Sequence, residues 1–182
     1  MIYLPNILSL IRIIVVPLIL WLLIRDLFII SAITITIVGL TDFFDGYLAR
    51  KYNSESLVGF YLDVIADKVL IITIYVILVV KLLLPVYLII LILSREALIF
   101  GAYLFKLVFD LKFDLKPILI SKINTFLQIT LIIFVCFLAL NQFNQLGEAM
   151  FIRNCLIVLV TITTIVSSLI YIIIWLKVLG SE

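Results

Sequence analysis

Long apolar runs, separated by short polar breaks, follow one another along the whole chain. A helix crosses the hydrocarbon core of a bilayer with about 17 to 25 residues, and each run is of that order. The runs predict six helices, at about 7–24, 27–49, 57–80, 82–106, 118–140 and 154–178. No repeat or linker interrupts the pattern, so residues 1–182 are expected to form a single integral-membrane domain of the all-α class.

The composition agrees with a membrane environment. Of the 182 residues, 66% are hydrophobic and 13% are charged, which leaves too few polar side chains to cover a soluble domain of this length. The net charge is +2 without a basic stripe, which argues against a nucleic-acid partner. The chain contains no histidine, and this excludes imidazole bases and the usual zinc sites.

Lysine and arginine are distributed unevenly between the two predicted sides of the membrane. With six spans, both termini lie on the same side as the second and fourth loops. That side has six of these residues and the other has three: Arg50, Lys51, Lys106, Lys112, Lys116 and Lys177 against Arg25, Lys81 and Arg153. The excess predicts that both termini are cytoplasmic. A compact chain without a visible transit peptide further favours a bacterial inner membrane.

Four aspartates lie inside the second and third predicted helices. Asp42 and Asp45 are three residues apart, and Asp63 and Asp67 are four apart, so each pair occupies one face of its helix. The loop between the two helices is short, and the helices are therefore expected to pack as an antiparallel pair. A carboxylate within the membrane is costly, and such groups normally face partners or a wet cavity.

Four neighbouring carboxylates repel one another unless cations neutralise them. Oxygen ligands without imidazole suit Mg²⁺ or Mn²⁺, and four carboxylates can share two ions. A pair of such ions fits pyrophosphate chemistry, and Arg50, at the end of the second helix, is placed to contact a phosphate. A cation-coupled transporter with an acidic ion site is the alternative that the spacing leaves open.

The run Asp42-x₂-Asp45-Gly46-x₂-Ala49-Arg50-x₈-Gly59-x₃-Asp63-x₃-Asp67 resembles the signature of the CDP-alcohol phosphatidyltransferase family at every defined position. The resemblance implies a six-helix membrane fold, usually dimeric. It implies an enzyme that transfers a phosphatidyl group from CDP-diacylglycerol to an alcohol and releases CMP. It also implies metal-binding roles for Asp42, Asp45, Asp63 and Asp67, with Asp67 as the general base.

The same resemblance implies contacts to the CDP-lipid. Gly46 and Arg50 match residues at its phosphates and nucleotide, and Ser56 matches a less constant polar contact. The segment from Leu4 to Arg12 resembles the stretch leading into the first helix, in which Asn6 and Ser9 would face the cytidine. Ordinary helix N-capping is an alternative role for Asn6 and Ser9, and it is compatible with the first.

Polar residues in the later helices bear on the identity of the acceptor alcohol. The fifth predicted helix carries a polar stripe with the spacing i, i+3, i+4, i+7, namely Ser121, Asn124, Thr125 and Gln128. This stripe either forms hydrogen bonds between helices or lines an acceptor cavity. We predict that Arg95, Lys122 and Asn124 bind the acceptor.

The run Leu115-Lys116-Pro117-x₂-Ile120-Ser121-Lys122-x-Asn124-Thr125-x₂-Gln128, after Ile92-Leu93-Ser94-Arg95-Glu96, resembles the eukaryotic-type cardiolipin synthases of the same family. That branch uses phosphatidylglycerol. The branch that uses glycerol-3-phosphate more often has a second lysine where Asn124 stands. The resemblance therefore favours phosphatidylglycerol, with glycerol-3-phosphate and hence phosphatidylglycerophosphate synthesis as the alternative.

Overall fold

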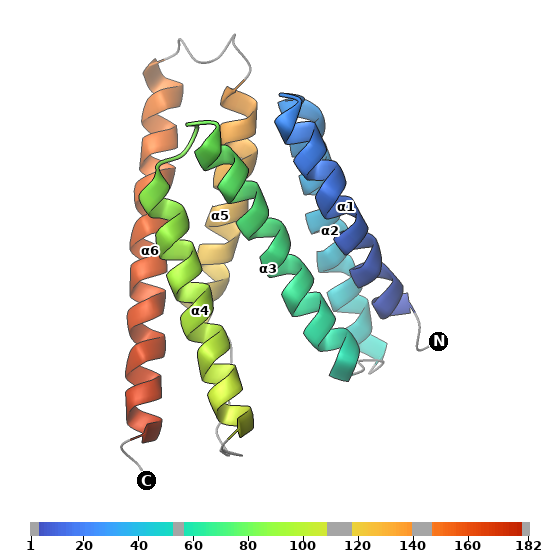
Figure 1. The fold of residues 1–182 in the computed structure, drawn as a ribbon, viewed down its shortest axis with the longest axis vertical. Coiled ribbons are helices and arrows are strands. Elements are labelled where there is room, and N and C mark those ends of the chain that lie inside the picture. Colours follow the sequence, from blue (N-terminus) through green and yellow to red (C-terminus); the bar gives the residue numbers. More distant parts are fainter. Residues whose placement is uncertain (1–3, 53–56, 109–117, 140–146, 180–182) are drawn as a thin grey trace. The chain divides into compact units, whose positions relative to one another are not determined.

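The computed structural model describes the backbone of residues 4–52, 57–108, 118–139 and 147–179, and the side chains of 14–41, 68–102, 118–139 and 147–176. Within these ranges the chain forms six α-helices and no strand, which confirms the all-α class (Figure 1). The helices are α1 (Leu4–Ile24), α2 (Phe28–Tyr52), α3 (Leu57–Val80), α4 (Val86–Val108), α5 (Leu119–Leu138) and α6 (Gly147–Leu179).

Two helix starts differ from the sequence prediction. Helix α4 begins at Val86 rather than near 82, because Pro85 precedes it and Leu82 adopts a left-handed conformation that ends the previous helix. Helix α6 begins at Gly147 rather than near 154. The prediction placed the break at Asn141–Glu148 and counted Arg153 with the loop before the helix, whereas α6 includes Arg153 and has Glu148 in its first turn, where an acidic side chain is favourable.

Two helices in the described part have the length and apolar composition of a membrane span, at Leu119–Leu138 and Gly147–Leu176. Three further apolar helical stretches of 10–17 residues lie at Ile14–Ile24, Phe28–Thr41 and Lys68–Val80. These helices fit a membrane protein. Six complete spans remain a prediction.

The chain divides into two compact units. The first comprises Met1–Leu83 with Ile132–Leu146, and the second Leu84–Leu131 with Gly147–Glu182. In the first unit α1 packs against both α2 and α3, and α2 runs antiparallel to the other two (Figure 1). The core of this unit includes Ile19 and Leu23 of α1 and Ile74 and Leu78 of α3, all nearly inaccessible to solvent.

Helix α2 contributes a row of buried residues to the first unit. Phe28, Ser31 and Ile35 follow at spacings of three and four and are all buried, which is the pattern of one helix face turned inward. The Ser31 hydroxyl donates to the carbonyl of Leu27, four positions before it, at 2.9 Å. Its polar group is therefore satisfied within its own helix and requires no partner from a neighbour.

The turns that end α1 and α3 share one hydrogen-bond pattern. Asp26 and Leu82 each adopt a left-handed backbone conformation, with φ of 62° and 59°. In both turns the N–H of this residue bonds to the carbonyl three positions earlier, and the next N–H bonds to the carbonyl five positions before it. This Schellman arrangement ends each helix, here without a glycine.

Lys81 links these two turns. Its Nζ lies 2.5 Å from Oδ1 of Asp26 and donates to the carbonyl of Ile24 at 3.3 Å. The ammonium also stands 5.7 Å from the centroid of the Phe28 ring, within the range of a cation–π contact. The turns after α1 and α3 thus lie on the same side of the first unit, as the sequence predicts for the first and third loops.

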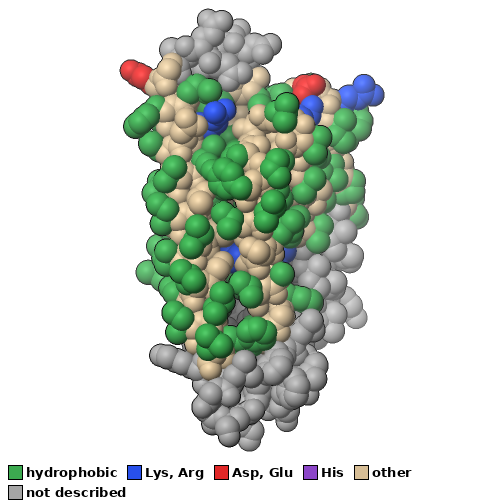
Figure 2. Space-filling view, turned by 60° about the vertical axis from the view of Figure 1, so that its left-hand side comes forward, with side chains coloured by type: hydrophobic (Ala, Val, Ile, Leu, Met, Phe, Trp, Pro, Cys, Tyr) green, Lys and Arg blue, Asp and Glu red, His purple; other side chains and the backbone are tan. Residues whose placement is uncertain are grey.

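The second unit contains α4, the first part of α5, and α6. Helices α4 and α6 pack together and run in the same direction (Figure 1). Among the described side chains of the whole chain that are visible in Figure 2, most are apolar, and most of the charged ones lie near one end. The apolar surface of α6 on this unit includes Ile162, Ile165, Leu169 and Ile173, all exposed, as expected for side chains that face lipid.

Candidate functional site

The predicted metal and CDP-lipid residues lie on the first three helices. Helix α1 carries Asn6 and Ser9, α2 carries Asp42, Asp45, Gly46 and Arg50, and α3 carries Asp63 and Asp67. The side chains of these eight residues, and all of Ser56, lie outside the described part of the structure. Among the side chains that are described, no three carboxylates or thiols gather as a metal site. The metal-binding assignment therefore remains a prediction.

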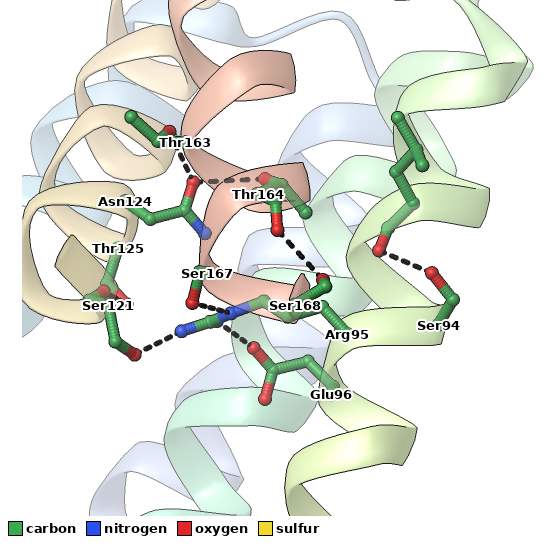
Figure 3. Close-up of polar contacts among 11 residues, drawn as sticks. Ser94, Arg95, Glu96, Ser121, Asn124, Thr125, Thr163, Thr164, Ser167 and Ser168 are labelled. Atoms are coloured by element: carbon green, nitrogen blue, oxygen red, sulfur yellow. Dashed lines mark hydrogen bonds and ion pairs between the residues drawn. The ribbon is translucent and has the colours of Figure 1, made fainter. Parts of the chain in front are cut away.

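The described residues do contain a polar cluster, inside the second unit, where α4, α5 and α6 meet. Its members are Arg95 and Glu96 of α4, Ser121 and Asn124 of α5, and Thr163, Thr164 and Ser167 of α6 (Figure 3). We call this set the three-helix polar cluster. The sequence analysis predicted that Arg95 and Asn124 bind the acceptor alcohol, and the structure places both residues in this one cluster.

Arg95 is the charged centre of the cluster and is only 2% exposed. Each of its three guanidinium nitrogens has a different partner. Nε donates to Oγ of Ser167 at 3.3 Å, one terminal nitrogen pairs with the Glu96 carboxylate, and the other donates to the Ser121 hydroxyl. A guanidinium carries five N–H bonds, so these three contacts leave two N–H bonds for other acceptors.

This arrangement explains why a charge is tolerated in an apolar helix. A buried cation is costly unless it is paired and hydrogen-bonded. Glu96 supplies the opposite charge from the next position on α4, and the two serines supply oxygen acceptors from α5 and α6. The planar guanidinium can reach all three directions at once, which a lysine ammonium on the same helix would not do with the same geometry.

Asn124 is the neutral centre of the cluster and is 0% exposed. Its side-chain oxygen accepts hydrogen bonds from the hydroxyls of Thr163 at 2.8 Å and Thr164 at 3.0 Å, both on α6 (Figure 3). Its amide nitrogen is buried and has no hydrogen-bond partner among the described residues. The amide therefore has a saturated acceptor on one side and two unused donor hydrogens on the other.

The polar stripe of α5 is directed inward, as predicted. Asn124 and Gln128 are fully buried, and Ser121 and Thr125 are partly buried. Ser121 and Asn124 bond to other helices, so the hydrogen-bonding role is confirmed for these two. The hydroxyl of Thr125 instead donates to the Ser121 carbonyl within α5 at 3.2 Å.

Lys122 lies apart from the cluster. The sequence grouped it with Arg95 and Asn124, but its side chain is exposed and it takes part in none of the cluster's contacts. The helical period accounts for this. Residues 121 and 124 face the cluster, and position 122 is turned by about 100° from its neighbour at 121. Whether Lys122 contacts a ligand from that direction stays a prediction.

Sequence reasoning missed the contribution of α6. Thr163, Thr164 and Ser167 supply the hydroxyls that bind Asn124 and Arg95. A signal was present, because Thr164, Ser167 and Tyr171 follow at i, i+3 and i+7 and are all buried. Polar residues on one face of an otherwise apolar helix indicate contacts to neighbouring helices. Which helices they contact does not follow from the spacing.

Comparison with known sequences gives a family for nearly the whole chain. The profile of the CDP-alcohol phosphatidyltransferase family matches residues 2–179. A fission yeast (Schizosaccharomyces pombe) protein described as a cardiolipin synthase (CMP-forming)/mitochondrial hydrolase fusion is 35% identical over 183 residues, which cover 92% of this chain and 30% of that protein.

Two further relatives carry the name of the other branch, CDP-diacylglycerol–glycerol-3-phosphate 3-phosphatidyltransferase. The chloroplastic protein of rice (Oryza sativa subsp. japonica) is 33% identical over 71% of this chain and 44% of its own length. The protein of Rickettsia typhi is 37% identical over 69% of this chain and 71% of its own length. The chain thus spans less than half of the yeast and rice proteins, and similar identities link it to relatives named for both reactions.

Proposed function

The chain belongs to the CDP-alcohol phosphatidyltransferase family, and from this premise we propose that it is a membrane enzyme that transfers a phosphatidyl group from CDP-diacylglycerol to an alcohol. The observation that carries the proposal is the family match over residues 2–179, which includes every position of the aspartate signature. The same match argues against the cation-coupled transporter. We propose phosphatidylglycerol as the acceptor and cardiolipin as the product.

The proposed metal site consists of Asp42 and Asp45 of α2 and Asp63 and Asp67 of α3. Four carboxylates and no imidazole form an oxygen-only ligand set, which fits two Mg²⁺ or Mn²⁺ ions. Such ions would neutralise charge on the diphosphate of the CDP-lipid. Gly46, Arg50 and Ser56 are the proposed contacts to that lipid's phosphates and nucleotide, and Asn6 and Ser9 the contacts to its cytidine.

In the proposed reaction Asp67 accepts the proton of the acceptor hydroxyl. The hydroxyl oxygen then forms a bond to the lipid-side phosphorus of CDP-diacylglycerol. The bond from this phosphorus to the bridging oxygen breaks, and that oxygen leaves with CMP. Arg50 stabilises the negative charge that develops on the phosphates, so catalysis rests on positioning and electrostatics. The proton passes from Asp67 to water or to the released CMP.

The acceptor assignment rests on Arg95, Lys122 and Asn124. Phosphatidylglycerol carries one negative charge on a phosphodiester, whereas glycerol-3-phosphate carries nearly two. The three-helix polar cluster combines a single guanidinium, already paired with Glu96, with a neutral amide. This limited positive charge suits a singly charged acceptor better than a dianion. Phosphatidylglycerophosphate synthesis is the second candidate, because relatives named for that reaction are equally similar.

We further propose that the enzyme is a homodimer in a bacterial cytoplasmic membrane, with its termini and active site on the cytoplasmic side. The distribution of lysine and arginine between the two predicted sides supports this orientation. Cysteines introduced at Ser54 and Leu82 in a variant lacking Cys136 and Cys155 would test it. A membrane-impermeant thiol reagent should label position 82 in intact cells and position 54 only after the cells are opened.

The decisive assay uses purified full-length protein in vesicles that contain CDP-diacylglycerol and Mg²⁺. We expect CMP release and cardiolipin formation with phosphatidylglycerol, much less product with glycerol-3-phosphate, and none after addition of a chelator. Asp67→Asn should abolish turnover while the protein remains folded. Phosphatidylglycerophosphate as the dominant product would establish the second candidate. Ion flux without CMP release from any alcohol would refute the enzyme.

A further inference from the structure

The orientation of the Asn124 amide is set by α6. Thr164 determines this orientation, because its hydroxyl makes no hydrogen bond to its own helix among the described residues. The neighbouring hydroxyls of Thr161 and Thr163 do donate to carbonyls four positions earlier, each at 2.8 Å. The proton of Thr164 therefore needs the oxygen of Asn124 as its acceptor, and this fixes which end of the amide faces α6.

Thr163 reinforces the same orientation. Its hydroxyl lies 2.8 Å from both Oδ1 of Asn124 and the carbonyl oxygen of Leu159, and 3.2 Å from the carbonyl oxygen of Val160, so its single proton is shared among three acceptors. A carbonyl oxygen has two lone pairs, and the two threonines occupy both on Asn124. The amide nitrogen must then point away from the threonines (Figure 3).

This orientation of Asn124 is energetically unfavourable for its amide nitrogen. The nitrogen is buried and has no hydrogen-bond partner among the described residues. Most buried polar groups are hydrogen-bonded, and an unsatisfied donor is unfavourable. Two hydroxyls thus hold the amide in the orientation that leaves its donors unused, and within the same cluster lies the guanidinium of Arg95 with further N–H bonds to offer.

We propose that Thr163 and Thr164 are positioning residues that aim the Asn124 amide nitrogen at an oxygen of the acceptor's phosphodiester. The inference rests on the proposed function and deepens it, because it assigns part of acceptor recognition to α6. Asn124 donates the hydrogen bond, and the threonines act only through Asn124. A neutral donor held in this way binds a phosphodiester oxygen without adding a second full charge to the site.

The test compares three substitutions in α6, two at Thr164 and one at Thr161. Thr164→Val removes the hydroxyl with little change of shape, and Thr164→Ser keeps it. Thr161→Val is the matched control, because the Thr161 hydroxyl bonds only within α6. We expect Thr164→Val to raise KM for phosphatidylglycerol by about three- to tenfold, the equivalent of one hydrogen bond. KM for CDP-diacylglycerol should not change, and Thr164→Ser and Thr161→Val should behave like the wild type.

A double-mutant cycle tests whether Thr164 acts through Asn124. Asn124→Leu should itself raise KM for phosphatidylglycerol, and adding Thr164→Val should then have no further effect. Additive effects, an unchanged KM in Thr164→Val, or equal changes in KM for both substrates would overturn the inference. If wild-type protein releases CMP with neither phosphatidylglycerol nor glycerol-3-phosphate, the proposed function fails instead. Wild-type activity with unaffected threonine variants refutes only the role of α6.

Discussion

Two ion pairs among the described residues stand in opposite surroundings. In the first unit, Lys81 and Asp26 join two turns at the ends of helices, and their side chains are 22% and 68% exposed. In the second unit, Arg95 and Glu96 lie within α4, and their side chains are 3% and 12% exposed. Water can replace each partner of the first pair, whereas the second pair depends on groups from three helices.

This contrast shows what each pair can contribute. An exposed pair adds at most about 1 kcal/mol to stability, because its charges are well solvated when apart. A buried pair often adds nothing compared with apolar residues of the same size, but removal of one partner is strongly destabilising. Lys81 therefore holds together the turns after α1 and α3, and Arg95 fixes the positions of Glu96, Ser121 and Ser167 around its guanidinium. We expect changes in the two units to differ in both size and kind.

The largest effect is expected for Arg95→Leu. The change removes the only cation of the three-helix polar cluster and withdraws partners from Glu96, Ser121 and Ser167. We expect a loss of about 3 kcal/mol in stability and a fall in transferase activity of more than about 100-fold. Denaturant titration in detergent and CMP release measure the two effects. Arg95→Lys should have stability and activity between those of the wild type and Arg95→Leu, because lysine keeps the charge but lacks the planar set of guanidinium N–H donors. Wild-type stability in Arg95→Leu would contradict this account of the cluster.

An intermediate effect is expected for Ser167→Ala. The hydroxyl accepts from Nε of Arg95 at 3.3 Å, and its loss leaves one guanidinium N–H without that acceptor. We expect about 1 kcal/mol of destabilisation and a rise of about two- to fivefold in KM for the acceptor. Ser168→Ala is the control, since the Ser168 hydroxyl donates to the carbonyl of Thr164 within α6 at 2.8 Å. Equal behaviour of the two alanine variants would mean that Nε gains nothing from Ser167.

The smallest effect is expected for Lys81→Met, which keeps the aliphatic chain and removes the charge. The ion pair with Asp26 and the contact with the Phe28 ring are both lost. We expect a loss of about 0.5 to 1 kcal/mol that shrinks further at high salt, with kinetic constants unchanged. Thermal unfolding at two salt concentrations measures it. A large loss of activity would contradict this account, because it would mean that the proposed metal site of α2 and α3 depends on this ion pair.

The helices were predictable from the sequence because the apolar runs are long and the breaks are short. The prediction started α6 too late, because the polar residues Glu148 and Arg153 belong to the helix. It also placed Arg95 and Asn124 in one site, and the structure brings both into one cluster. This agreement is physically reasonable, since buried polar groups need polar partners in an apolar interior.

What the sequence could not provide is the set of contacts between distant helices. The bond from Thr164 to Asn124 joins residues 40 positions apart, and that from Arg95 to Ser167 joins residues 72 apart. Periodicity assigns a residue to a face and leaves open which helix covers that face. Lys122 shows the same limit, because it was grouped with Arg95 and Asn124 by its charge, whereas its position on α5 leaves it exposed and outside the cluster; its contact with the acceptor stays a prediction.

The self-satisfied hydroxyls of α2 have a consequence for how that helix is held. Ser31, Thr34 and Thr36 each donate to a carbonyl of their own helix, so no polar contact from these groups fixes the rotation of α2 about its axis. Packing of Phe28, Ser31 and Ile35 against the first unit must do so. Asp42 follows Ile35 by seven positions in the same helix. A bulky side chain in place of Ser31 would therefore rotate α2 about its axis and change the direction of the proposed metal ligands near the other end of the helix.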